Sequence, residues 1–91
     1  RHGNNVITGW LEMAIFAREI IGREVVDAHN EKLGLLTDLI IDKQSGSVTI
    51  AVVKLESNLD PNLLPWEHEK GAVRIPIDDV SRISRQIHLK R

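Results

Sequence analysis

Three apolar runs rich in β-branched residues, separated by two short polar breaks, dominate residues 20–55 of this chain. The runs end near residues 26, 42 and 55, and the breaks cover residues 27–31 and 43–47. Runs of this length, bounded by turn-forming residues, are typical of consecutive β-strands. The sequence therefore predicts a three-stranded meander at the centre of the fold, and no active-site spacing lies within it.

Four residues mark the expected turns and strand ends. Asn30 lies in the first break and tolerates a left-handed backbone, because its short polar side chain can bond locally. Gly46 lies in the second break and is predicted to have a positive φ. Gly34 lies inside the second strand and indicates a bulge or bend where another backbone comes close. Pro76 cannot donate to a ladder, so we expect it at a strand end or edge.

The second and third strands look apolar on both sides. The second carries Leu33, Leu35, Leu36, Leu39, Ile40 and Ile41, more than a strand with one wet face needs. Residues 50–53 are apolar at every position. Strands that are bent by glycine and covered on both faces favour a closed or nearly closed barrel. We therefore predict an all-β fold, a small, strongly bent antiparallel β-barrel of five or six strands.

A chain of 91 residues fits one domain, and chains this short bury only about 60% of their unfolded surface. Self-association is therefore an expected source of further stability. The chain has no cysteine, which excludes disulfides, thiolate metal sites and cysteine nucleophiles. No apolar run approaches the roughly 18 residues of a membrane span, so we expect a soluble, cytoplasmic protein.

Residues 1–12 are polar, contain glycine and lack a helical or strand period. The one methionine, Met13, follows them. We expect a single domain over residues 13–91, and residues 1–12 to be either an added leader or a weakly ordered native arm. Residues 13–21 fit a short edge strand or one helical turn.

The second half of the chain begins with a break in the pattern. Residues 56–71 hold two of the three prolines and no clean period, so they predict a long loop. Residues 72–77 and 83–89 alternate like strands, with a turn or single helical turn at 78–81. The strand centres predict one core made of Val25, Leu36, Leu39, Ile41, Ile50, Val52, Val73, Ile75 and Ile87.

The predicted loop contains four large apolar residues, Leu59, Leu63, Leu64 and Trp66. Exposed together, they would form the kind of apolar patch that marks an interface, with Trp66 as an anchor. Alternatively, the loop folds back as a lid and buries them in the mouth of its own barrel. The sequence leaves both arrangements open.

Positive charge gathers at the C-terminal end of a chain whose net charge is −1. Residues 70–91 carry six basic and two acidic residues, a net charge of +4. The candidate basic face consists of Arg74, Arg82, Arg85, Lys90 and Arg91. Such a face is either a solvated strand face and tail or a surface for an acidic protein or RNA phosphates. RNA binding usually adds stacking aromatic residues, which are few here.

Candidate chemistry is sparse. Asp27, Asp38, Asp42, Asp78 and Asp79 are interpreted as turn caps and strand-end residues rather than acid–base groups. The segment 67–69 (EHE) is the one local histidine–carboxylate cluster, but consecutive residues rarely converge on one metal. His29 and His88 are interpreted as surface residues, and no glycine-rich phosphate loop is present. We expect no catalytic, cofactor-binding or metal-binding residues and no small-molecule substrate. An unrecognised metal-dependent activity is the least supported alternative.

Several segments resemble the PRC-barrel domain family. They are residues 22–27 (GREVVD), 33–42 (LGLLTDLIID), 45–48 (SGSV) and 75–80 (IPIDDV), and the likeness to short, single-domain archaeal members covers residues 16–89. Asn30, where the family usually has glycine, and the extended segment 56–71 depart from the pattern. The resemblance implies a small barrel that binds other proteins.

We therefore expect a non-catalytic protein-interaction or adaptor module with a protein partner, self-associating as a homodimer. The alternative is an RNA-binding or RNA-processing accessory module that uses the basic C-terminal strand.

Overall fold

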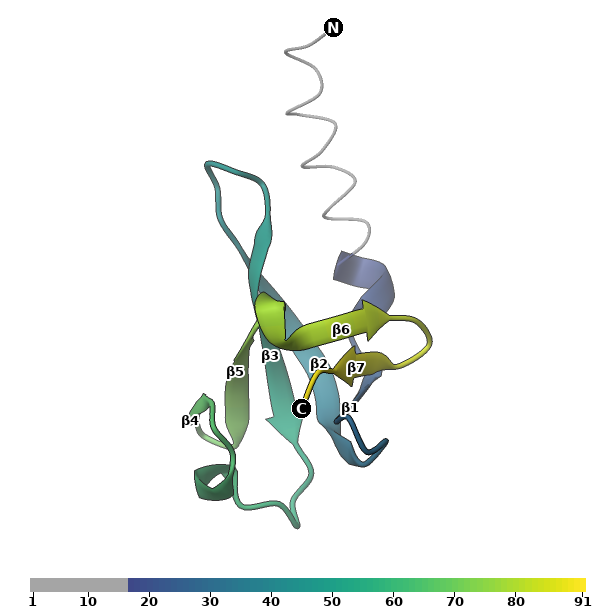
Figure 1. Ribbon diagram of the computed structural model, residues 1–91. Helices are drawn as coiled ribbons and strands as arrows, with labels where there is room; N and C mark the ends of the chain where they lie inside the picture. The colour runs from purple at the N-terminus through teal and green to yellow at the C-terminus, as the bar shows by residue number, and fades with distance from the viewer. Residues whose placement is uncertain (1–16) are drawn as a thin grey trace, which may run out of the picture.

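The computed structural model describes residues 17–91, and the expectations for residues 1–12 lie outside the described residues. The predicted meander is present, formed by β1 (Glu24–Val26), β2 (Lys32–Ile41) and β3 (Val48–Leu55). Residues 17–20 form a helical turn ahead of β1, which is one of the two arrangements open for that segment. Figure 1 shows the β2–β3 hairpin as the longest feature of the sheet.

The second half is more regular than predicted. The segment expected to be a loop contains a 3₁₀ turn, η1 (Pro61–Leu63), and a short strand, β4 (Glu67–Glu69). The strand expected at residues 72–77 is β5 (Ala72–Pro76), followed by the 3₁₀ turn η2 (Ile77–Asp79). The prediction of a single terminal strand at residues 83–89 was wrong. Two strands, β6 (Val80–Ile83) and β7 (Ile87–Leu89), form a hairpin there.

All the strands belong to one sheet in the order β4-β5-β3-β2-β1-β7-β6. The all-β prediction is therefore confirmed. The strand count of five or six was too low, since the sheet has seven strands, and it is not purely antiparallel, because β1 and β7 run parallel. The sheet bends so that the β6–β7 hairpin crosses over β2 and β3 (Figure 1). β4 and β6 are its two edges.

The core lies between the β6–β7 hairpin and the inner face of β1, β2, β3 and β5. Its members are Ile20, Val25, Leu33, Leu36, Ala51, Val53, Leu55, Trp66, Val73, Ile75, Ile87 and Leu89. Five of the nine predicted core residues, Val25, Leu36, Val73, Ile75 and Ile87, are buried, and Leu39 packs against them half-buried. Apolar burial of this kind is the main favourable contribution to folding.

The predicted core was wrong at Ile41, Ile50 and Val52, which are only half-buried. Ile50 and Val52 lie on the opposite face of β3 from the buried residues, since side chains alternate along a strand. The expectation that both faces of β2 are covered was also wrong. Leu35 is 40% exposed and Ile40 is 37% exposed.

The residues expected at turns and strand ends have the conformations that their positions require. Asn30 has φ 65° and Gly46 has φ 72°, both in the left-handed region. A Cβ added to Gly34 would overlap the Lys54 carbonyl group on β3, and the pairing of β1 with β2 shifts register beside it. Pro76 is the last residue of β5. None of the helices within residues 17–91 has the length and apolar character to cross a membrane.

Candidate functional site

The outer face of the sheet carries an apolar row that crosses three strands. Ile40 on β2 pairs with Ile50 on β3, and Ile50 pairs with Pro76 on β5. Val52 lies on the same face, two residues along β3. We call Ile40, Ile50, Val52 and Pro76 the outer strip. Residues directly opposite on neighbouring strands have Cβ atoms about 5 Å apart, so the outer strip forms one continuous surface.

Two opposite charges flank the outer strip. Val52 pairs with Asp38 on β2 and with Arg74 on β5, so the three side chains lie in one row across the sheet. Asp38 and Arg74 are both exposed. The ion pairs formed within residues 17–91 are Lys32–Glu24, Lys32–Glu56 and Arg91–Asp79. Neither Asp38 nor Arg74 therefore has an ionic partner in the described part of its own chain.

One end of the outer strip borders a shallow groove at the β5 side. Ile50, Pro65, Trp66, Glu67, Arg74 and Pro76 line it. Trp66 is only 9% exposed, and its indole Nε1 donates to Asp79 Oδ2 at 2.9 Å. A buried tryptophan usually finds such a partner for its N–H. This bond holds the segment before β4 against η2, so the groove has a fixed wall.

The four apolar residues of segment 56–71 do not gather on the surface. Trp66 belongs to the core, and Leu59 and Leu64 pack against the core half-buried. Leu63 is the exception, since it lies on η1 and is 83% exposed. Three of the four thus take the inward positions of the lid arrangement, and one points outward.

The five residues of the candidate basic face lie in four places. Arg82 on β6 and Lys90 after β7 line a groove, which we call the basic groove. Arg91 reaches Asp79 at 3.9 Å, and Arg85 is exposed in the turn between β6 and β7. Arg74 belongs to the outer face instead. The structure therefore brings together two of the five.

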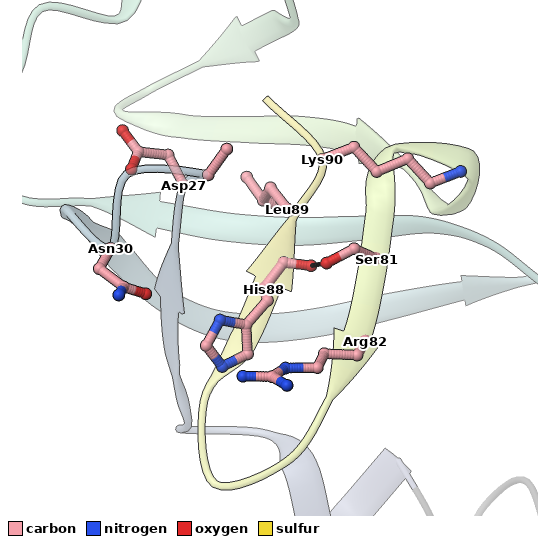
Figure 2. Close-up of a pocket in the computed structure, with 8 residues that line it drawn as sticks. Asp27, Asn30, Ser81, Arg82, His88, Leu89 and Lys90 are labelled. Carbon is pink, nitrogen blue, oxygen red and sulfur yellow. Dashed lines mark hydrogen bonds between the residues drawn. The ribbon is translucent and has the colours of Figure 1, made fainter.

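The basic groove also contains residues that the sequence did not single out as a group. Arg82 pairs with His88 across the β6–β7 hairpin, and Ser81 Oγ donates to the His88 carbonyl oxygen. Figure 2 shows Asn30 and Arg82 near the His88 ring, with Lys90 extending away from them. Asp27 supplies a negative charge at the rim. These residues were not grouped from the sequence, because the hairpin of residues 80–89 that brings them together was not predicted.

A family model for the PRC-barrel domain matches residues 12–91. The chain belongs to the PRC-barrel domain family. Among curated proteins no match was found. A solved structure of a Pseudomonas aeruginosa protein, described as 16S ribosomal RNA processing protein RimM, is similar in fold. It has a TM-score of 0.52 and 18% identity over 82% of this chain. The match covers 42% of that protein, so this chain corresponds to less than half of its length.

The carboxylates of this PRC-barrel domain mainly organise turns. Asp27 Oδ1 accepts bonds from two backbone N–H groups, those of His29 and Glu31. Asp42 and Asp60 each accept one from the residue two positions further on. His68 lies 3.0 Å from the Asn62 side-chain oxygen. Within residues 17–91, no three His, Asp or Glu side chains are grouped so that they could hold a metal ion.

One small ionic network ties the start of the PRC-barrel sheet together. Gln86 donates to Glu24 Oε1 at 3.0 Å, and Lys32 Nζ lies 3.3 Å from Glu24 Oε2. These two bonds lower the pKa of the Glu24 carboxyl group below its ordinary value. The bonds from Lys32 to Glu24 and Glu56 raise the pKa of the Lys32 ammonium group. The network links β1, β2 and the β6–β7 turn.

The outer strip was missed because Ile50 and Val52 were assigned to the core. One signal in the sequence identifies their face. Lys54 has the same parity as Ile50 and Val52 along β3, and a lysine seldom points into a core. Arg74 and Pro76 mark the outer face of β5 in the same way.

Proposed function

We propose that this PRC-barrel domain is a non-catalytic cytoplasmic adaptor that acts by binding proteins and associates with its own copies. The outer strip is the observation that supports this proposal. It presents apolar side chains of three adjacent strands on the face that points away from the core. Contiguous exposed apolar surface is a mark of protein interfaces.

The rigidity of this surface favours the same role. The outer strip lies on regular strands rather than on a loop, and the strands beneath it hold the buried residues Ala51, Val53 and Ile75. A surface built on packed strands changes little on binding. The proposed interaction therefore needs no rearrangement of the domain.

A single substitution tests the proposal. Ile40 is 37% exposed, so Ile40→Lys should leave the fold intact while it places a charge in the outer strip. We expect the parent chain to sediment as a dimer and the Ile40→Lys variant as a monomer, at concentrations from about 1 to 100 µM. The circular dichroism spectra of the two proteins should be alike.

Leu63→Lys is the matched control, because Leu63 is exposed but lies on η1, outside the outer strip. It should keep the mass of the parent chain. A parent chain that remains monomeric at every concentration contradicts self-association. An Ile40→Lys variant that stays dimeric removes the outer strip from the interface.

The basic groove favours a second candidate, binding to the phosphates of an RNA. Arg82, His88 and Lys90 gather there, and the similar structure is described as an RNA processing protein. For binding of this kind, the logarithm of the association constant falls linearly with the logarithm of the salt concentration. Titration of a fluorescent single-stranded RNA at several salt concentrations, with Arg82→Gln as the comparison, measures that slope. Absence of salt-dependent binding would eliminate this candidate.

A further inference from the structure

We infer that two copies of this chain pack outer face to outer face about a two-fold axis parallel to β3, with Asp38 of each copy against Arg74 of the other. The inference rests on the proposed self-association and names its geometry. The occupant of the outer strip is thus a second copy of the same chain.

The inference is based on the register of β2, β3 and β5. On the outer face, Asp38 lies on the β2 side of Val52 and Arg74 lies on the β5 side. The next row has the same order, with Ile40 on β2, Ile50 on β3 and Pro76 on β5. β3 is therefore the midline of a surface whose two sides carry opposite charges.

A two-fold axis parallel to β3 exchanges the β2 side with the β5 side and keeps each position along the strand. It places Asp38 against Arg74 of the partner subunit, and Arg74 against Asp38 of the partner subunit. Ile40 then meets Pro76 of the partner subunit. Ile50 and Val52 lie near the axis and meet their own copies. Every apolar residue of the outer strip has an apolar neighbour in this arrangement.

The charges distinguish this axis from the other in-plane axis. A two-fold axis that lies in the plane of the interface and perpendicular to the strands places each strand opposite its own copy in the partner subunit. Through the row of Val52, it would bring Asp38 against its own copy and Arg74 against its own copy. Like charges in contact across an interface are strongly unfavourable. The axis parallel to β3 turns both repulsions into attractions.

Asp38 and Arg74 are suited to this pairing, because neither has an ionic partner within residues 17–91. Among the described residues, Asp38 Oδ1 accepts one hydrogen bond, from the N–H of its neighbour Leu39. Glu67 on β4 lies next to Arg74 in the sheet register, but the two side chains form no ion pair within residues 17–91. An arginine can accommodate two carboxylates, since it presents five N–H donors in a fixed fork.

Lys54 sets the limit of the contact. It lies on the outer face of β3, next to the row of Leu35 and Ala72. On the proposed axis it would face Lys54 of the partner subunit. Packed sheets diverge from their crossing point because each is twisted, so the closest contact falls on the rows of Ile50 and Val52. The two lysines then lie apart in solvent at the rim.

Charge reversal tests the axis on the full chain. Asp38→Arg and Arg74→Asp should each lower the association constant at least about tenfold, since each puts two like-charge contacts into the symmetric interface. The double variant Asp38→Arg/Arg74→Asp should recover most of the loss, because it restores both attractions. Sedimentation equilibrium measures the constants, and circular dichroism checks that each variant is folded.

Glu31→Arg and Lys43→Asp are the controls, because they match the charge changes of Asp38→Arg and Arg74→Asp at exposed positions between strands, outside the outer face. Both should retain the parent association constant. A dimeric parent whose single variants associate as tightly as it does overturns the axis and leaves self-association standing. The same holds if the single variants dissociate and the double variant does not recover. A monomeric parent overturns the axis together with the proposed self-association.

Discussion

Gly34 and Gly46 are both glycines of the β2–β3 region, but they are required for different reasons. Gly46 has φ 72°, and a Cβ added there would meet no atom within 4 Å. Glycine is therefore required at this position for its backbone conformation. A Cβ at Gly34 would overlap the Lys54 carbonyl group, so its need is steric. The steric need is the stronger one, because a strand backbone cannot move without disturbing its neighbours.

We expect Gly46→Ala to destabilise the domain by about 1 kcal/mol, the usual cost of an L-residue in a left-handed turn. Gly34→Ala should cost about 3 kcal/mol or more, since overpacking against backbone forces the strands apart. Urea unfolding of the two variants measures the difference. Equal losses would show that β2 and β3 separate easily at Gly34.

The Glu24 network gives a pH dependence with a definite sign. The pKa of Glu24 is lower in the folded state than in the unfolded state, through its bonds to Gln86 and Lys32. Its contribution to stability is therefore complete above the unfolded pKa and is lost as the pH falls through the folded pKa. Glu24→Gln removes that contribution at neutral pH.

We expect the thermal midpoint of Glu24→Gln to lie below that of the parent chain at about pH 7, and the gap to narrow below about pH 4. Thermal melts between those pH values check this. Glu31→Gln, in an exposed turn, is a suitable comparison because its side chain has no ion pair within residues 17–91. A difference in thermal midpoint that widens as the pH falls would contradict the predicted direction of the pH dependence.

At the scale of single elements, β3 shows how one strand serves two surfaces. Its odd-numbered residues Ala51, Val53 and Leu55 are buried, while Ile50 and Val52 face outward. Ile75 on β5 pairs with Ala51 and is fully buried, so it differs from Ile50 mainly in the face it occupies.

Alanine substitution at these two isoleucines separates the faces. Ile75→Ala should cost about 2–5 kcal/mol, as for other fully buried isoleucines. Ile50→Ala should cost about 1 kcal/mol, because its side chain is already half in water. Urea unfolding at a concentration where the chain is monomeric provides the comparison. Similar losses of unfolding free energy at both positions would show that Ile50 belongs to the core.

The sequence predicted the elements whose signals are local. The meander was identified because each of its strands is bounded by a polar break with a residue that tolerates a turn. The β6–β7 hairpin was missed because alternation continues through residues 83–89, and its turn has neither glycine nor proline. β4 was missed because its three residues, Glu67–Glu69, are a strand only through pairing with β5.

At the scale of the whole molecule, the sequence did not predict which apolar residues remain outside. Residues 50–53 are apolar throughout, so the face that packs depends on β5 and on the β6–β7 hairpin, which lie far along the chain. Leu59, Leu64 and Trp66 likewise pack on a core built from distant strands, and Trp66 also bonds to Asp79. Surfaces defined by such distant contacts follow from the three-dimensional fold.

The parallel pairing of β1 with β7 has a consequence for how the chain folds during synthesis. Val25 is made well before its neighbour in the sheet, Ile87, which lies far along the chain. The meander can form while translation continues, yet one side of β1 stays without its partner strand until β7 has left the ribosome. Pairings of such long range also slow folding, because a large loop must close first. The sheet is therefore completed only after β7 has been made, and β1 is the strand that waits longest for a neighbour.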